Sequence, residues 1–247
     1  LILLAIFLLF SQCKTNPNEV KINIFAAASL ADILNEFETE FESQNKLIDL
    51  QISYGASNLL TQQIIKGAPA NIFIPAGTGP IKVLHQKQHP DIKVYPFISN
   101  ELVLVSHPDK QLNLKNLYEL TNIDIKRFAI ADPKLAPAGE YSRLALQNNN
   151  VWDFLQPKLV LATDVRATLT YISSRNADMG IVYSTDAMSK PDLKITKIPK
   201  DTYPEITYPI ILIDDAKKKN AINEFLNYLL SEKTNPAIKK YGFKKIE

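Results

Sequence analysis

Residues 22–30 read INIFAAASL, a short apolar strand that runs into a turn of small residues just before a helical pattern begins. The same order of strand, turn and helix recurs at 49–60 (DLQISYGASNLL), 128–140 (FAIADPKLAPAGE) and 159–169 (LVLATDVRATL). Each junction leaves the first backbone N–H groups of a helix without partners and points the positive end of the helix dipole out of the carboxyl edge of a sheet. Four such junctions that face one crevice would surround a small oxyanion.

The stretches between these junctions predict an α/β fold. Short β-rich runs alternate with amphipathic helical segments, which is the pattern of open, mostly parallel sheets flanked by helices. In the first helical segment, an apolar face is expected to pack on the sheet; it contains Leu30, Ile33, Leu34, Phe37 and Phe41.

Two proline-marked segments, YPFISNELVLVSH at 95–107 and TYPEITYPIILID at 202–214, are interpreted as crossings between two lobes. Two crossings make two hinge strands, and hinge strands permit the lobes to close over a ligand. The expected first lobe consists of residues 21–98 plus 205–247, and the second lobe consists of residues 99–204.

The composition limits the classes of partner. The 247 residues are 46% hydrophobic and 22% charged, which describes a folded globular chain rather than a disordered one. With 28 basic and 26 acidic residues the net charge is only +2, so there is no general field for nucleic acid or an anionic membrane. A single cysteine excludes an internal disulfide and a cysteine-based zinc site.

The first residues predict export from the cell. Residues 1–10 (LILLAIFLLF) are about half as long as a membrane-spanning helix, so we interpret 1–12 as the core of an export signal whose start is missing. Cys13 directly follows and resembles the lipidated cysteine of bacterial lipoproteins. Two alternatives follow for Cys13: it is lipidated, or it is an incidental cysteine after a plain secretory signal. Residues 13–20 are expected to form a tether at the periplasmic or cell-surface side.

Five residues at the predicted strand ends are candidates for holding the anion. Ser29 and Ser57 can offer hydroxyl groups and neighbouring amides, Ala138 and Val165 can offer backbone N–H groups at helix starts, and Tyr183 can offer a phenolic O–H. The alternative is structural: the serines cap helices, each worth about 1 kcal/mol, and the tyrosine is a packing residue. The alternative weakens because all five occupy equivalent edges.

The charges beside these turns are few. The turns contain no lysine, and Arg166 is the only arginine beside them; we expect it to pair with an acid such as Asp186. Asp164 is expected to cap the helix that starts at Val165, although it could also accept a proton from the ligand. A cage of donors without acceptors favours a fully deprotonated oxyanion over hydrogen phosphate, because the phosphate proton would lack a partner.

Several motifs, in this order and spacing, resemble the substrate-binding proteins of molybdate ABC transporters. They are AAASL, GAPANIFI, DP followed by PAGEY, DVRATL and GIVYSTDA, and the similarity runs from about Lys21 to Phe243. Departures from the family pattern are Asn71 in place of an acid, and Pro75 and Gly77 in place of a serine and an acid.

The resemblance implies a two-lobed type II periplasmic-binding-protein fold and a monomer without a cofactor. It implies that the ligand is molybdate or tungstate and that ABC permease and ATPase subunits are partners. It also implies that the oxyanion is held by the hydroxyls and amides at Ser29 and Ser57, the amides of Ala138 and Val165, and the hydroxyl of Tyr183.

Three other functions are alternatives for this sequence. An enzyme of acyl or phosphoryl transfer would need a base near the serines, but His85, His89 and His107 all lie away from the predicted turns. The effector domain of a transcription regulator would need a helix-turn-helix segment, where the chain has a hydrophobic leader instead. A carrier for sulfate, phosphate or an organic acid remains open, because the donor cage also suits sulfate.

Overall fold

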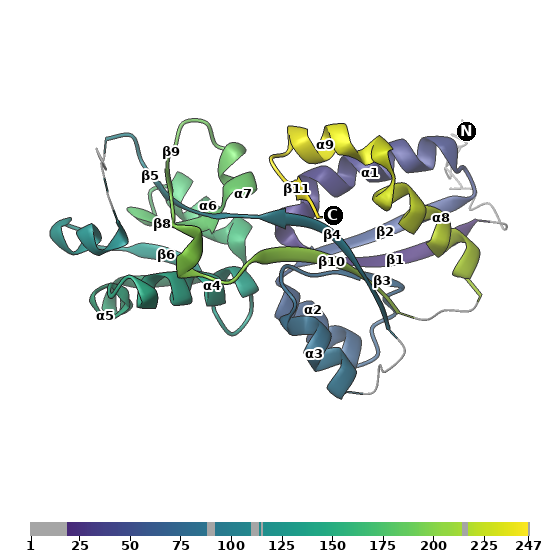
Figure 1. Cartoon of the computed structure of the whole chain (residues 1–247), viewed down its shortest axis with the longest axis horizontal. Helices are drawn as coiled ribbons and strands as arrows, with labels where there is room; N and C mark the ends of the chain where they lie inside the picture. Colours follow the sequence, from purple (N-terminus) through teal and green to yellow (C-terminus); the bar gives the residue numbers. More distant parts are fainter. Residues whose placement is uncertain (1–18, 88–91, 110–113, 115, 214–216, 247) are drawn as a thin grey trace, which may run out of the picture.

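The computed structural model describes residues 19–87, 92–109, 114, 116–213 and 217–246. The chain forms two α/β lobes that lie side by side along the long axis of the molecule (Figure 1). The export signal, Cys13 and His89 lie outside the described residues. No helix in the described ranges has both the length and the apolar character needed to cross a membrane.

The first lobe is built on a six-stranded sheet in the order β11-β4-β10-β3-β1-β2. Its strands are β1 (Val20–Ala27), β2 (Ile48–Gly55), β3 (Ile72–Ile74), β4 (Lys93–Asn100), β10 (Ile206–Leu212) and β11 (Lys244–Lys245). One face carries α1 (Ala31–Gln44), α8 (Lys219–Leu230) and α9 (Asn235–Lys240), and the other carries α2 (Ser57–Ile65) and α3 (Gly79–Gln86) (Figure 1).

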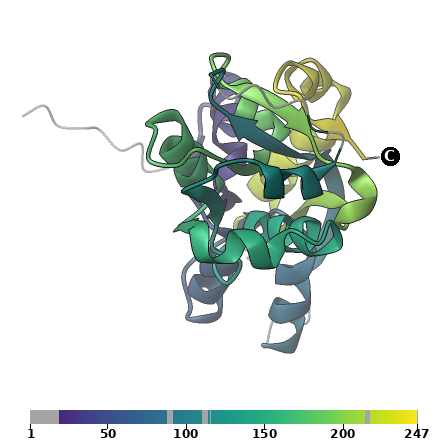
Figure 2. The same ribbon diagram turned by 90° about the vertical axis from the view of Figure 1, so that its left-hand side faces the viewer.

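The second lobe is built on a five-stranded sheet in the order β7-β6-β8-β5-β9. Its strands are β5 (Leu102–Ser106), β6 (Phe128–Ala131), β7 (Leu159–Ala162), β8 (Met179–Tyr183) and β9 (Lys194–Lys197). Its α-helices are α4 (Pro137–Asn148), α5 (Trp152–Leu155), α6 (Val165–Ser173) and α7 (Ser184–Met188). In the view of Figure 2, α4 (green) runs across the lower part of this lobe.

The expected fold class is confirmed, and each sheet has a larger antiparallel share than the sequence pattern indicated. β1 pairs parallel with β2 and β3, and β6 pairs parallel with β7 and β8. The strands next to the crossings instead pair antiparallel: β10 with β3 and β4, and β5 with β8 and β9. A chain that leaves one lobe and later returns must run in opposite directions through the hinge, which accounts for the antiparallel pair of β4 and β10.

Apolar packing holds the elements against the sheets. The predicted apolar face of α1 and the turn before it is buried, with every one of its five residues at most 3% exposed. Phe41 also makes an edge contact with Phe225 of α8, at 5.0 Å between ring centroids. Burial of aromatic and aliphatic side chains is the main stabilising contribution here, at roughly 1.5–3 kcal/mol for each large side chain. The rigid sheet therefore fixes where β1 ends and where the turn at Ser29 begins.

One glycine determines how closely α4 approaches its sheet. A Cβ atom at Gly139 would lie only 2.1 Å from the carbonyl oxygen of Ala131 in β6. Any side chain at this position would push the helix away from the end of the strand. Glycine thus allows the first turn of α4, including Ala138, to sit directly over the carboxyl end of β6.

Candidate functional site

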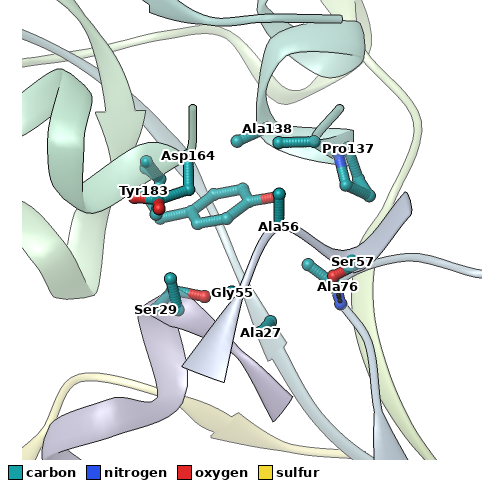
Figure 3. A pocket seen from close by; sticks show the side chains of 13 residues that line it. Ala27, Ser29, Gly55, Ala56, Ser57, Ala76, Pro137, Ala138, Asp164 and Tyr183 are labelled. Atoms are coloured by element: carbon teal, nitrogen blue, oxygen red, sulfur yellow. Dashed lines mark hydrogen bonds between the residues drawn. The ribbon is translucent and has the colours of Figure 1, made fainter. Parts of the chain in front are cut away.

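All four strand-to-helix junctions meet around one small cavity between the lobes (Figure 3). The cavity is small, with a volume of about 10 Å³. All five residues proposed from the sequence line it, and each is at most 4% exposed. The full lining is Ala27, Ala28, Ser29, Gly55, Ala56, Ser57, Ala76, Ala136, Pro137, Ala138, Asp164, Val165 and Tyr183.

The two serines do not act as helix caps, which corrects that expectation. The helices that follow them begin after Leu30 and Ala56, and neither has a side-chain cap. Ser57 is instead the first residue of α2, and its Oγ accepts a hydrogen bond from the backbone N–H of Ala76 at 3.0 Å. Because a backbone N–H can only donate, the hydroxyl proton of Ser57 stays available for a ligand. Ser29 Oγ lies 3.0 Å from Oη of Tyr208, a residue of β10.

Ala138 and Val165 present backbone amides at the starts of α4 and α6. Pro137 opens α4, and the Asp164 side chain caps α6 by accepting from the N–H of Ala167 at 2.9 Å, so the predicted cap is confirmed. Among the hydrogen bonds of the described residues, none uses the N–H of Ala138 or Val165 as donor. Both amides are therefore free to donate to a ligand at the positive end of a helix dipole.

Tyr183 ends β8 and points its phenol ring across the cavity (Figure 3). Its hydroxyl is fully buried and has no hydrogen-bond partner within the described part of the chain. Burial raises the pKa of Tyr183 well above its usual value, so the hydroxyl keeps its proton at neutral pH. A buried donor without a partner costs free energy, and a ligand oxygen would remove that cost.

The expected pairing of Arg166 with Asp186 is confirmed, with Nε 2.5 Å from Oδ1, and a second partner was missed. A terminal nitrogen of Arg166 also lies 2.6 Å from Oδ2 of Asp32, which belongs to α1 in the first lobe. Burial raises the pKa of the Asp186 carboxyl to about 7, against the lowering effect of Arg166. Arg166 is therefore held between two acids and does not line the cavity. Sequence spacing could not indicate Asp32, because it lies 134 positions away.

A second contact between the lobes comes from Asn58, which follows Ser57 in α2. Its backbone N–H donates to the carbonyl oxygen of Leu135 at 3.2 Å, and its side-chain amide donates to that of Lys134 at 3.3 Å. The sequence pattern does not indicate this contact, because Asn58 and Lys134 lie 76 positions apart. The contact holds the start of α2 against the loop before α4, so it brings the junctions of Ser57 and Ala138 together.

Breaking the pair between Asp32 and Arg166 should weaken ligand binding by up to about 5-fold. The Asp32 side chain is 45% exposed, so the ion pair is worth only about 0.2–1 kcal/mol in the closed arrangement. Asp32→Asn removes the charge but keeps the shape, and the loss should shrink in high salt. Isothermal titration calorimetry with molybdate at low and high salt measures the change.

Asp49→Asn is the matched control, because Asp49 pairs with Lys21 inside the first lobe at 3.6 Å. Its affinity should equal that of the unchanged protein. An equal loss in both variants would contradict a role of Asp32 in holding the lobes together.

The described histidines do not contact the cavity. His107 is buried in the second lobe, where its Nε2 lies 2.6 Å from the carbonyl oxygen of Ile172. His85 is an exposed residue of α3. Neither is among the lining residues, so neither is placed to activate Ser29 or Ser57 as a nucleophile.

Two lobes joined by hinge strands around a cavity lined by hydrogen-bond donors define a solute-binding protein. The chain belongs to the family of bacterial extracellular solute-binding proteins, whose model matches residues 22–244.

Individual relatives agree with this assignment. The molybdate-binding protein ModA of Escherichia coli (strain K12) is 32% identical, over 92% of this chain and 90% of its own. A Bacillus subtilis (strain 168) protein named "Putative ABC transporter substrate-binding lipoprotein YvgL" is also 32% identical, over 97% of this chain and 95% of its own. The solved periplasmic molybdate-binding protein of Azotobacter vinelandii superposes with a TM-score of 0.80 at 24% identity, over 92% of this chain and 100% of its own. The resemblance to molybdate-binding proteins seen in the sequence motifs is thus confirmed.

Proposed function

We propose that this protein binds a fully deprotonated tetrahedral oxyanion, molybdate or tungstate, and delivers it to an ABC importer. The observation that supports this most is the chemistry of the cavity: its lining supplies two hydroxyls, a buried phenol and helix-start amides, and includes no lysine or arginine. Aligned amide and hydroxyl dipoles can replace the hydration shell of a dianion without a countercharge. The relatives named for molybdate binding support the choice of ion.

The proposed ligand set is the one expected from the strand ends. The hydroxyls and amides of Ser29 and Ser57 come from the first lobe, and the amides of Ala138 and Val165 and the hydroxyl of Tyr183 come from the second. The ligand then favours the closed arrangement, because only there do donors from both lobes converge. The lobes that close are proposed to be residues 21–98 plus 205–247 and residues 99–204.

The size of the cavity supports an inorganic ligand. Its volume of about 10 Å³ is far below the roughly 300–1,000 Å³ of pockets that hold drug-sized organic molecules. The only acid in the lining, Asp164, already caps α6 through Oδ1. A protonated oxyanion such as hydrogen phosphate would therefore meet mainly donors, with the carboxylate of Asp164 as the only acidic side chain in the lining that could accept its proton.

The remaining parts of the proposal concern the cellular context. We infer an exported monomer, anchored by lipid at Cys13, that presents its ion to permease and ATPase subunits and performs no covalent chemistry. The relative named a lipoprotein supports the anchor. Mass spectrometry of the protein isolated from its native membrane tests it, since an unmodified Cys13 would contradict lipidation.

Sulfate is the second candidate, because it is also a fully deprotonated tetrahedral dianion at neutral pH. Titration calorimetry of the purified protein with molybdate, tungstate, sulfate and phosphate separates the possibilities. We expect tight binding of molybdate and tungstate, weaker binding of sulfate and no measurable binding of phosphate. Tightest binding of sulfate would reassign the ligand, and tight binding of phosphate would contradict a cavity that selects a fully deprotonated oxyanion.

A further inference from the structure

A row of buried polar side chains leads away from the cavity along the two hinge strands. Tyr208 in β10 lies with its Oη 3.0 Å from Oγ of Ser29, and Nδ2 of Asn100 in β4 lies 3.1 Å from the same Oη. Tyr208 is 0% exposed and Asn100 is 7% exposed, although neither lines the cavity. Buried polar groups need partners, so the direction of each hydrogen bond in this row can be worked out.

The orientation of the Asn100 amide is fixed by its neighbours. Its Oδ1 lies 2.8 Å from the backbone N–H of Glu101, which can only donate, and 3.0 Å from Oγ of Ser184. The carbonyl oxygen of the amide therefore faces Glu101, and Nδ2 faces Tyr208 and Oγ1 of Thr185, the latter at 2.9 Å. Because Nδ2 can only donate, the Tyr208 oxygen must accept from it.

The same reasoning fixes the next bond. The Tyr208 hydroxyl has one proton, and Ser29 Oγ is its only hydrogen-bond partner besides Asn100 among the described residues. Burial raises the pKa of Tyr208, so the proton stays on the hydroxyl. Tyr208 therefore donates to Ser29, Ser29 accepts, and the Ser29 proton is left to point into the cavity.

We propose that Tyr208 and Asn100 are positioning residues that fix the hydroxyl of Ser29 as a hydrogen-bond donor toward the bound oxyanion. This inference rests on the proposed function. The row also strengthens the Ser29 donor, since hydrogen bonds in a chain polarise one another. With one lone pair engaged by Tyr208 and its own proton directed into the cavity, Ser29 is arranged to meet the oxyanion as a donor. The hinge strands thereby contribute to the choice of ion without touching it.

A double-mutant cycle on Tyr208 and Ser29 tests the proposal. Tyr208→Phe should weaken molybdate binding by about 3- to 10-fold, because Ser29 loses the partner that orients and polarises it. In the Ser29→Ala background the same change should have no further effect on affinity, because there is no hydroxyl left to orient. Titration calorimetry with molybdate on the unchanged protein, the two single variants and the double variant gives the coupling free energy between Tyr208 and Ser29. A role of Tyr208 in folding alone would lower affinity equally in both backgrounds.

Tyr203→Phe is the matched control. Tyr203 also lies beside the hinge and accepts from the N–H of Leu102 at 3.1 Å, but it does not contact Ser29. Removing the Tyr203 hydroxyl should leave molybdate affinity unchanged, both in the otherwise unchanged protein and in the Ser29→Ala variant. Asn100→Ala provides a second variant should Tyr208→Phe fold poorly, with an expected loss of about 2- to 5-fold that also disappears in the Ser29→Ala background.

The outcomes separate this inference from the proposed function. If Ser29→Ala weakens binding while Tyr208→Phe and Asn100→Ala leave it unchanged, or act equally in both backgrounds, the positioning role is wrong and the oxyanion site stands. If Ser29→Ala itself leaves molybdate binding unchanged, the proposed site is wrong and the positioning role falls with it.

Discussion

Replacing Ser29 and Ser57 together with alanine should weaken molybdate binding by about 10²- to 10⁴-fold. Each hydroxyl is buried in the cavity lining, and a hydrogen bond to a charged acceptor contributes about 1.5–3 kcal/mol. Two such losses amount to about 3–6 kcal/mol, and every 1.4 kcal/mol is a tenfold change in affinity. Titration calorimetry with molybdate measures the change in affinity, and competition titrations measure it where binding is weak.

The control for this double variant is Ser43→Ala with Ser173→Ala. Both hydroxyls are exposed and bond only to carbonyl oxygens of their own helices. This pair of changes should leave affinity within a factor of two of the unchanged protein. If the variant that lacks Ser29 and Ser57 binds as tightly as the control, the ion must bind elsewhere.

Tyr183→Phe should separate affinity from stability. The variant should bind molybdate about 10- to 100-fold more weakly, because it lacks one donor to a charged acceptor. The ligand-free protein should be at least as stable as before, since the lost hydroxyl is buried without a partner. Calorimetry measures the first effect, and thermal unfolding without ligand measures the second.

Tyr228→Phe should show the opposite behaviour. Its hydroxyl donates to Glu40 at 2.8 Å on the outer side of the first lobe, away from the cavity. Removing it should lower the melting temperature slightly and leave molybdate affinity unchanged. A Tyr183→Phe protein that is clearly less stable but binds normally would show that Tyr183 is a packing residue.

Much of the site could be predicted from the sequence because its parts are local. A strand followed by small residues and a helix start is visible in consecutive residues, and the edge where such junctions meet follows from the geometry of parallel strands. From these local patterns one site was predicted, and the structure places its five residues in the lining of one cavity: Ser29, Ser57, Ala138, Val165 and Tyr183. The cap formed by Asp164 was predicted for the same reason.

What the sequence could not indicate depends on the packing of distant segments. Tyr208 reaches Ser29 across 179 positions, and Asp32 reaches Arg166 across 134. Helix capping was the structural alternative for the two serines, because serine favours that position, but tertiary partners, Tyr208 and the N–H of Ala76, engage both hydroxyls. The larger antiparallel share of the sheets likewise depends on which strands the hinge brings together.

In the proposed site, backbone amides at Ala138 and Val165 would bind the charge of the ion, while the side chains at these positions would set the size of the cavity. Main-chain donors are present whatever side chain is attached, so residues at these two positions can change without removing a donor from the cage. The methyl and isopropyl groups that now line the cavity then act as spacers that set its diameter. A lineage of such proteins could therefore adapt to a larger or smaller tetrahedral ion by exchanging spacers, while the means of holding a double negative charge stayed the same.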